Sequence, residues 1–539
     1  MGFFAQDKWN INKGFTLTMG LRADIPIFEQ NFPTNANADA LTFRDGIKIK
    51  TGRAPSTQIL WSPRVGFNWD VKGDKTFQLR GGAGVFAGAP PFVWLSNQAS
   101  NNGVDFGSYA IQPGQNGVAL NDPRFIFNAD VNANKPENAA ANTSYNLAIT
   151  DNKFKFPQLF RANLAIDYKL PFDITGTLEG IYNKDINGVY HQNINLPTTG
   201  APLLGFDNRI RYTSAQIYSN PPATATNASP NITDAILMKN TSKGYTYNVT
   251  LQLQRNVKNL YTMIAYSHGD SRSVNDGGSI AQSIWRDRSV SGDPNADVTS
   301  YSNFYQPNRV VAAAAYRFEY AKHFATSFGF TFESANGGTA SYLYGTTPNT
   351  FAGTGQRAGA DLNNDGLAND LIFVPAAKSE IILERQGGTS AIADPRTPDQ
   401  QWEQLNAYIE QDDYLKSKRG RYVERNGLLL PFYTRMDFNF TQDFFVNVKG
   451  KRNTLRFTMD IFNFTNLLNR NWGAFKTTNR TTLLNFLRME TTGPNAGKPV
   501  YNFPYLDAAN KVPLSSTFQN STGQGSRFQA QIGVRYIFN

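Results

Sequence analysis

The chain has 539 residues, and its 52 Lys and Arg residues against 42 Asp and Glu residues give a formal charge of +10. Aromatic residues make up 13% of the sequence and charged residues only 17%, a balance opposite to that of disordered chains. The absence of cysteine excludes a disulfide scaffold, a thiolate metal site and a cysteine nucleophile. The three histidines, His191, His268 and His323, are too far apart in sequence for a HExxH-type zinc site.

The first residues, 2–11, have the pattern of a β-strand, so we expect no signal peptide after Met1. From Phe15 onward, apolar and polar residues alternate with a period of two, which predicts strands with one apolar and one polar face. In chain order, the long alternating runs cover residues 15–28, 57–71, 158–169, 243–256, 259–272, 305–320, 323–336, 431–446, 453–466 and 526–539. These runs exceed the ~5–6 residues of soluble strands and reach the ~9–11 residues of lipid-spanning strands.

The connections between the predicted strands alternate strictly between short and long. The short ones lie at 12–14, 72–75, 170–173, 257–259, 321–322 and 449–453, and the long ones at about 29–56, 88–157, 190–242, 273–304, 337–430 and 467–525. Short periplasmic turns and long extracellular loops are typical of outer-membrane barrels. We therefore predict an all-β fold, a transmembrane antiparallel β-barrel in the bacterial outer membrane. The alternative is a soluble β-sandwich that binds glycans and buries its apolar face against a second sheet.

The strand count predicts that the barrel is partial. Six short turns join twelve strands, and the last run makes thirteen; extra hairpins inside the long loops would add strands in pairs. If the short turns are periplasmic, the first strand descends from the outer side and the last one ends in the periplasm. Complete bacterial barrels have an even number of strands, so we expect further strands outside this sequence.

Several motifs follow one another in a fixed order, at residues 15–22, 62–67, 79–86 and 309–312 and at Asp460-Ile461-Phe462-Asn463-Phe464-Thr465-Asn466. This series resembles the TonB-dependent outer-membrane receptors, and within that family most closely the Oar-like group with carboxypeptidase-regulatory-like domains. The resemblance implies that residues 1–539 form one barrel domain, about thirteen or fourteen strands of a 22-stranded barrel. The signal peptide, the plug and the first strands of the family are not found in the sequence.

The resemblance also implies a function and its partners. Family members import a scarce ligand through a plug-gated pore, driven by an inner-membrane energy-coupling complex. We therefore expect a receptor barrel for an unidentified ligand that contacts outer-membrane lipid, a plug domain and that complex. The alternative is an outer-membrane adhesin whose long loops bind partners without transport.

The C-terminal strand resembles the signal that the barrel-assembly machinery recognises. Gly533 is followed by Tyr536 and Phe538, which are two residues apart and therefore share one face of a strand. The departure from the family is Asn539, one residue beyond the usual terminal aromatic residue. An ordinary final strand is the other interpretation.

An acidic segment has the opening of a calcium-binding loop. Asp361, Asn363 and Asp365 present oxygen side chains at alternate positions, and Gly366 permits a sharp turn. The position of the last EF-hand ligand holds Ile372, so Asp370 is the candidate for the remaining carboxylate. The segment predicts Ca²⁺ in an extracellular loop, with a polar turn that binds no metal as the alternative.

Arginines at polar positions of the strands form a second group of candidate site residues. A charge facing lipid costs ~2–4 kcal/mol at the membrane midplane, so we expect these side chains to face the lumen. They would hold a plug through charge-assisted hydrogen bonds or form cross-strand ion pairs. The group comprises Arg22, Arg64, Arg80, Arg161, Arg435 and Arg456, with Arg309, Arg317 and Arg535 at similar positions.

The sequence supports neither nucleic-acid binding nor catalysis. Basic residues are spread along the chain without a dense stripe, so the positive charge does not predict a nucleic-acid partner. No GxSxG, P-loop, GxGxxG or SxxK motif is found in a suitable context. We therefore expect no enzymatic activity.

Overall fold

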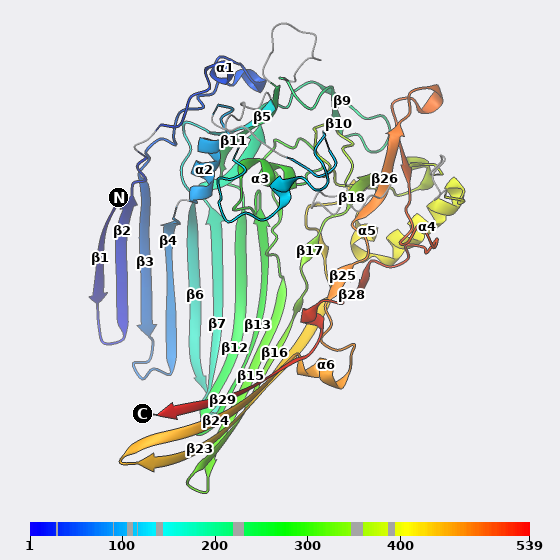
Figure 1. Ribbon diagram of the computed structural model, residues 1–539. Coiled ribbons are helices and arrows are strands. Elements are labelled where there is room, and N and C mark those ends of the chain that lie inside the picture. Colours follow the sequence, from blue (N-terminus) through cyan, green and yellow to red (C-terminus); the bar gives the residue numbers. More distant parts are fainter. Residues whose placement is uncertain are drawn as a thin grey trace.

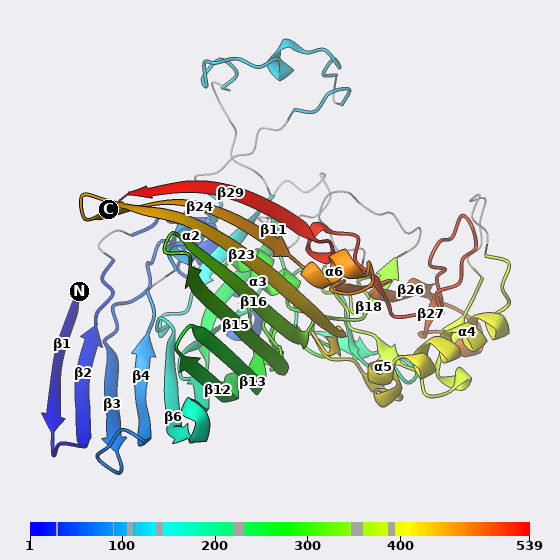
Figure 2. The ribbon, with the colours of Figure 1, turned by 90° about the horizontal axis from the view of Figure 1, so that it is seen from below.

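The computed structural model describes residues 1–28, 31–89, 91–104, 111–115, 117–135, 144–218, 231–346, 359–385 and 394–538. Thirteen strands follow one another in a single antiparallel sheet that curves from β1 round to β29 (Figures 1 and 2). They are β1 (Gly2–Asn10), β2 (Phe15–Asp24), β3 (Leu60–Asp70), β4 (Phe77–Ala87), β6 (Gln158–Leu170), β7 (Ile174–Asp185), β12 (Tyr245–Val257), β13 (Leu260–Ser273), β15 (Asn308–Tyr320), β16 (Phe324–Asn336), β23 (Phe432–Val448), β24 (Lys451–Phe462) and β29 (Gln529–Phe538).

This path confirms the thirteen predicted strands and their short turns. β14 (Ser300–Tyr301) pairs with β13 as a short addition beside the path. Among the described residues, β1 and β29 form the two edges of the sheet, and no register pairs one with the other. The described part of the chain is therefore a curved, open wall, and it does not display the closed barrel of 22 strands.

Some strand boundaries differ from the prediction. The run predicted at 453–466 ends at Phe462, because Asn463 has a φ of 53° and α6 (Phe464–Leu468) begins directly after it. The amide of Asn463 donates to Asp437 Oδ1 at 2.7 Å, which fixes this break in the strand. The run predicted at 15–28 likewise ends earlier, at Asp24.

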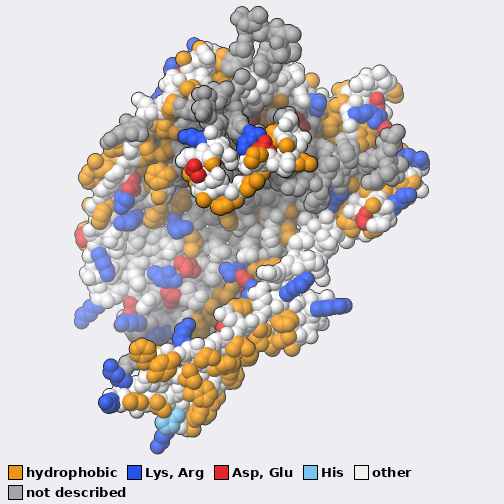
Figure 3. Space-filling model, in the orientation of Figure 1, with side chains coloured by type: hydrophobic (Ala, Val, Ile, Leu, Met, Phe, Trp, Pro, Cys, Tyr) orange, Lys and Arg blue, Asp and Glu red, His pale blue; other side chains and the backbone are white. Residues whose placement is uncertain are grey.

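The two faces of the wall differ in polarity, as the alternation predicts. In β12, the apolar side chains of Val249 and Leu251 are 45% and 52% exposed, whereas Asn248 and Thr250 lie on the opposite face. The outer surface of β23, β24 and β29 is a hydrophobic band, and charged side chains are scattered over the inner surface of the sheet (Figure 3). Exposed apolar area of this extent marks a contact with membrane or protein rather than with water.

The long connections gather at one end of the wall and fold into small sheets and helices (Figure 1). One group comprises α1 (Ala36–Asp39), α2 (Phe92–Ser100), α3 (Ala281–Asp287), the hairpin of β9 (Gly200–Pro202) and β10 (Ile210–Tyr212), and the sheet of β5 (Ser144–Thr150), β11 (Asn231–Thr241) and β8 (Gly188–Asn193). Short 3-10 turns lie at Arg44–Gly46, Pro123–Phe125, Pro171–Asp173, Lys378–Glu380, Gly493–Asn495 and Gln524–Ser526. No helix in the described residues combines the length and apolar character needed to cross a membrane.

A second group, which we name the external cap, consists of the described residues of 339–430 and 476–520. Its sheet joins β18 (Leu343–Thr346), β26 (Thr482–Met489), β27 (Pro499–Asn502) and β20 (Ile382–Leu383), with α4 (Pro398–Gln411) and α5 (Asp413–Ser417) packed beside it. Paired short strands complete it: β17 (Thr339–Ala340) with β22 (Leu428–Leu429), β19 (Phe373–Val374) with β21 (Arg421–Tyr422), and β25 (Lys476–Thr478) with β28 (Phe518–Asn520). The largest buried apolar cluster of the described residues lies in this cap, and it includes Tyr342, Leu405, Tyr408, Leu484 and Phe503.

Candidate functional site

The inner face of the wall carries pairs of arginine and acidic side chains. Arg80 on β4 donates from Nε to Asp167 Oδ2 on β6 at 2.9 Å and lies 3.4 Å from Glu179 on β7. Thr177 adds a hydrogen bond of 2.7 Å to Asp167. One guanidinium thus links three neighbouring strands across the sheet.

A second group of charges lies near the short turn between β23 and β24. The carboxylate of Asp443 is only 2% exposed and accepts from Arg456 Nε at 2.6 Å and from Arg317 Nη1 at 3.0 Å. The side chain of Arg317 also lies 3.4 Å from Glu319, which Arg452 approaches to 3.2 Å. Three arginines and two carboxylates from three strands thus form one network of ion pairs, with one positive charge in excess.

The other predicted arginines have local partners and stay apart from one another. Arg22 pairs with Asp24 at 2.7 Å and Arg435 with Asp437 at 2.8 Å, each within its own strand. Cross-strand contacts are Arg64 to Gln6 at 2.8 Å, Arg161 to Asn183 at 2.6 Å and Arg309 to Glu333 at 2.7 Å. In β29, Arg535 lies opposite Arg456 in register and therefore faces the same side. The predicted arginines share one face, but they line a surface rather than form one cluster.

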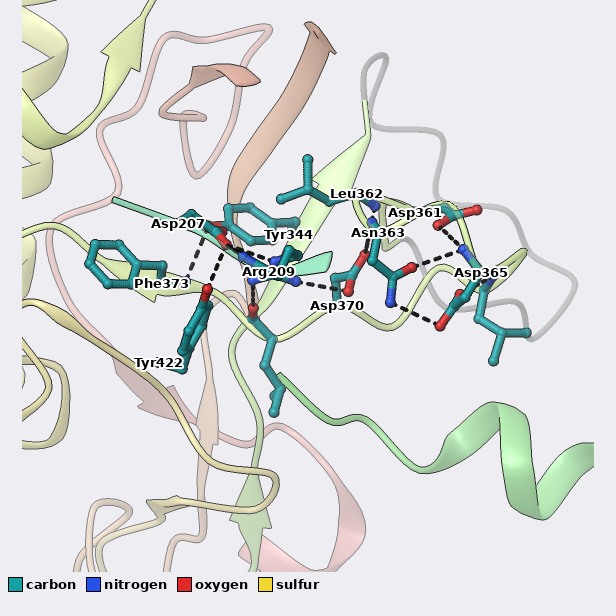
Figure 4. A network of polar contacts seen from close by, with 12 residues as sticks. Asp207, Arg209, Tyr344, Asp361, Leu362, Asn363, Asp365, Asp370, Phe373 and Tyr422 are labelled. Atoms are coloured by element: carbon teal, nitrogen blue, oxygen red, sulfur yellow. Dashed lines mark hydrogen bonds and ion pairs between the residues drawn. The ribbon is translucent and has the colours of Figure 1, made fainter. Parts of the chain in front are cut away.

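An ionic network joins the external cap to the β9–β10 hairpin (Figure 4). The buried side chain of Arg209 donates from Nε to Asp207 Oδ1 at 2.9 Å and from Nη1 to Asp370 Oδ1 at 2.8 Å. Its Nη2 donates to the carbonyl of Leu371 at 2.6 Å. The guanidinium carbon lies 5.1 Å from the ring centroid of Tyr344 and 5.3 Å from that of Tyr422, distances typical of cation–π contacts.

The carboxylates around Arg209 are fully hydrogen-bonded. Tyr344 and Tyr422 donate their hydroxyls to Asp207 at 2.8 and 2.9 Å. Burial alone lowers the pKa of Arg209, but the charges of Asp207 and Asp370 outweigh burial and raise it well above its ordinary value. Arg209 therefore keeps its positive charge, and its contacts fix the hairpin to the cap.

The acidic loop at 361–366 is held by its own hydrogen bonds. The amide of Asp365 donates to Asp361 Oδ1 at 3.1 Å and to Asn363 Oδ1 at 2.9 Å, and the amide of Gly366 donates to Asp361 Oδ2 at 3.0 Å. Gly366 has a φ of 89°, the left-handed conformation that the motif requires. The structure thus brings together the three side chains at alternate positions, although no group of three or more acidic or His residues in the described chain is arranged to hold a metal.

Asp370, the proposed fourth carboxylate, already has partners. Besides Arg209, it accepts from the amides of Leu362 at 2.6 Å and Asn363 at 3.0 Å. Burial, followed by the charge of Asp370, raises the pKa of Asp361 to about 6, and burial raises the pKa of Asp365 well above its ordinary value. Burial therefore disfavours the charged form of both carboxyl groups, in a loop whose Asp370 contacts Arg209.

The predicted assembly signal lies on the edge strand β29. Tyr536 and Phe538 share the outer face, 61% and 74% exposed, with ring centroids 5.9 Å apart. The hydroxyl of Tyr536 donates to Asn453 Oδ1 at 2.7 Å. On the inner face, a Cβ at Gly533 would lie 2.8 Å from Thr458 Oγ1, so the glycine permits close approach of the two strands.

Neither the cap nor the buried Arg209 that contacts it was predicted from the sequence. One signal for the cap was present, because Thr397 and Gln400 form a capping box with Pro398 at the first helical position of α4. Arg209 had no such signal, since apart from Asp207 its side-chain partners lie far away in sequence at 344, 370 and 422.

Comparisons with solved structures find receptors and transporters at low identity. The FrpB iron transporter from Neisseria meningitidis is 10% identical with a TM-score of 0.35, covering 86% of this chain and 40% of that chain. The siderophore receptor PirA from Pseudomonas aeruginosa is 9% identical with a TM-score of 0.31, covering 86% and 44%. A mutant of the ferric enterobactin receptor PfeA from the same species is 8% identical with a TM-score of 0.37, covering 99% and 44%. The chain thus spans less than half the length of these proteins.

No curated protein matches the chain. A family model does, over residues 1–493, and its description is outer membrane beta barrel domain. This family consists of outer-membrane barrels and not of enzymes, which agrees with the apolar outer face and the charged inner face of the wall. The chain therefore belongs to the outer membrane β-barrel domain family, and its place is the outer membrane.

Proposed function

We propose that the chain is the barrel part of a TonB-dependent receptor of the Oar-like group, which takes up a ligand through a plug-gated pore. The observation that carries the proposal is the wall, with apolar side chains outside, paired charges inside and all the folded long connections at one end. A soluble sandwich would bury the apolar face against a second sheet. Here that face is exposed, as lipid contact requires.

The proposed partners follow from the surfaces of the wall. Outer-membrane lipid contacts the apolar face, and the barrel-assembly machinery engages β29. A plug domain, supplied by the rest of the receptor, would lie against the inner face, where Arg22 pairs within its own strand and Arg64 and Arg161 contact the neutral amides of Gln6 and Asn183. An inner-membrane energy-coupling complex would pull on that plug.

One observation favours the second candidate function, an adhesin: the external cap has a buried apolar core of its own. The DNA upstream of Met1 separates the two functions first: a plug and an energy-coupling box support transport. Planar-bilayer recordings then test the pore. The full receptor should pass no ion current, and its plug-deleted form should conduct ions. If the plug-deleted form passes no ion current in the bilayer, the proposed pore is excluded and the adhesin function remains.

We also propose that the loop at 361–366 binds Ca²⁺ weakly. The support is the set of oxygen side chains from Asp361, Asn363 and Asp365, which lie together and carry charges that repel one another. A hard cation prefers such oxygen ligands. Asp370 would hold the loop in place through its contacts with Arg209 and with the amides of Leu362 and Asn363. Its carboxylate would also add negative charge beside the bound ion.

A further inference from the structure

A polar cavity of about 380 Å³ lies between the connection after β13, α3 and the turn that carries Arg425. Its volume falls within the range of small-molecule sites, about 300–1,000 Å³. α3 lies above the upper ends of the central strands (Figure 1), so the cavity belongs to the layer of long connections and not to the wall. None of the candidate residues from the sequence lines it.

Two buried arginines line this cavity. Arg288 is 4% and Arg425 is 6% exposed. Their Nη atoms donate to backbone carbonyl oxygens: Arg288 to Ala296 at 2.7 Å and to Pro294, and Arg425 to Val274 at 2.9 Å and Ser273 at 2.7 Å. The Nε atoms of both have no hydrogen-bond partner among the described residues. Carbonyls orient the two guanidinium groups but do not neutralise them.

Neither arginine forms an ion pair among the described residues, and the charges of Asp293 and Asp297 on Arg288 and of Asp276 on Arg425 act only from a distance. Burial, followed by the charge of Arg425, lowers the pKa of Arg288 to about 10. Burial also lowers the pKa of Arg425. Such a site favours a bound anion, because a buried cation without a counter-charge is costly.

The acidic residues of the lining are already engaged. Asp276 accepts from the hydroxyl of Ser273 at 2.5 Å and from the amide of Asn303 at 2.9 Å. Asp287 pairs with Arg286 at 3.2 Å. Of the five charged residues that line the cavity, three are arginines and two are aspartates, so its net charge is +1. The hydroxyls of Ser279 and Ser283 add neutral polar groups.

We propose that this cavity is an anion-binding site, in which Arg288 and Arg425 hold a phosphate or carboxylate group of a small molecule or of a larger ligand. Arginine suits both groups because its planar donors match their paired oxygens. The proposal concerns binding and holds whether or not the protein transports what it binds.

Calorimetric titration of the purified protein in detergent micelles tests the site. Inorganic phosphate and citrate are the two probes, which distinguish phosphate from carboxylate chemistry, and glucose is the neutral control. We expect one or both anions to bind and glucose not to bind. Arg288→Gln and Arg425→Gln should each weaken binding about tenfold, the effect of losing one charge-assisted contact. Arg288→Lys should weaken it less, since the charge is kept.

A matched control is Arg309→Gln, which removes a half-exposed arginine of the wall and should leave the affinity unchanged. Hydrogen–deuterium exchange of the wild-type protein tests the site without any substitution, so its result does not depend on whether a variant folds. Phosphate or citrate should slow exchange in residues 273–288 and 423–427. Failure of both anions to bind, protection confined to other segments, or equal weakening by Arg309→Gln would each overturn the proposal.

Discussion

Asp443 is the residue on which two arginines of the inner face converge. Because Arg456 and Arg317 both contact its nearly buried carboxylate, Asp443→Asn leaves two like charges facing each other. The guanidinium groups are about one-third exposed, which screens the effect, so we expect a loss of about 1–2 kcal/mol in the free energy of unfolding. Urea unfolding of the refolded protein measures it. Asp24→Asn, which removes a partner of the exposed Arg22, is the control and should change the free energy of unfolding much less than Asp443→Asn does.

Arg209 is the residue that ties the β9–β10 hairpin to the cap. Arg209→Gln leaves Asp207 and Asp370 buried without their cation, a loss worth about 3–5 kcal/mol. We expect the hairpin to detach while the wall stays folded, seen as faster hydrogen exchange in residues 200–212 and 359–374. Arg488→Gln removes an exposed ion pair with Glu384 and serves as control. If the exchange of these segments is unchanged in Arg209→Gln, the network does not hold the cap.

The face on which a side chain lies could be predicted from the sequence where the alternation of its strand sets that face. It could not be predicted where contacts between distant segments set the position of the side chain. Alternation alone places Arg80 and Arg456 on the inner face, because the period of a strand fixes which side a residue faces. The partner of Arg209 at Asp370 lies in a different connection, 161 positions along the chain. No local pattern carries that information, and the same holds for Arg288 and Arg425.

The acidic loop is the element on which the calcium proposal depends. Ca²⁺ should stabilise the loop by mass action, by about RT ln(1 + [Ca²⁺]/Kd). Chelation should therefore increase protease cleavage between residues 347 and 430 and leave the wall folded. Asp361→Ala combined with Asp365→Ala should have the same effect in the presence of calcium. Equal protection of the wild-type loop with and without chelator would make the segment a polar turn held by its own hydrogen bonds.

The strand β29 is the element proposed to start assembly. Tyr536→Ala combined with Phe538→Ala should slow insertion by the assembly machinery, because both rings face outward and neither is buried in the cap or the wall. The measurement is the rate at which the heat-modifiable folded form accumulates in membranes. Tyr320→Ala with Phe324→Ala removes a stacked pair of outer rings elsewhere in the wall and is the control. A normal rate for the β29 variant would remove the assembly role.

Elements of the wall were predictable and those of the cap largely were not. Period-two alternation encodes a strand with two different faces, so most strands of the wall appeared as alternating runs, and the short turns at 72–75 and 170–173 implied the two that did not, β4 and β7. In the cap, β18 pairs in parallel with β26, which lies more than 130 residues further on. Such short strands have too few residues for a visible period. Only α4 had a local signature, the capping box at Thr397 and Gln400.

The whole molecule is an asymmetric wall, with folded connections at one end and short turns at the other (Figure 1). The absence of cysteine allows the direction of this wall to be measured with single introduced thiols. Lys13→Cys and Lys72→Cys mark short turns, Asn510→Cys marks an exposed position in the cap, and Leu251→Cys marks the outer face of β12.

A membrane-impermeant maleimide applied to intact cells tests the central claim, that this wall spans the outer membrane with the cap outside. We expect rapid labelling at Asn510→Cys, labelling at Lys13→Cys and Lys72→Cys only after the cells are broken, and no labelling at Leu251→Cys in either case, because lipid covers that face. Labelling of the two short turns in intact cells with Asn510→Cys protected would reverse the direction of the wall. Rapid labelling of Leu251→Cys would show that the apolar face does not contact the membrane.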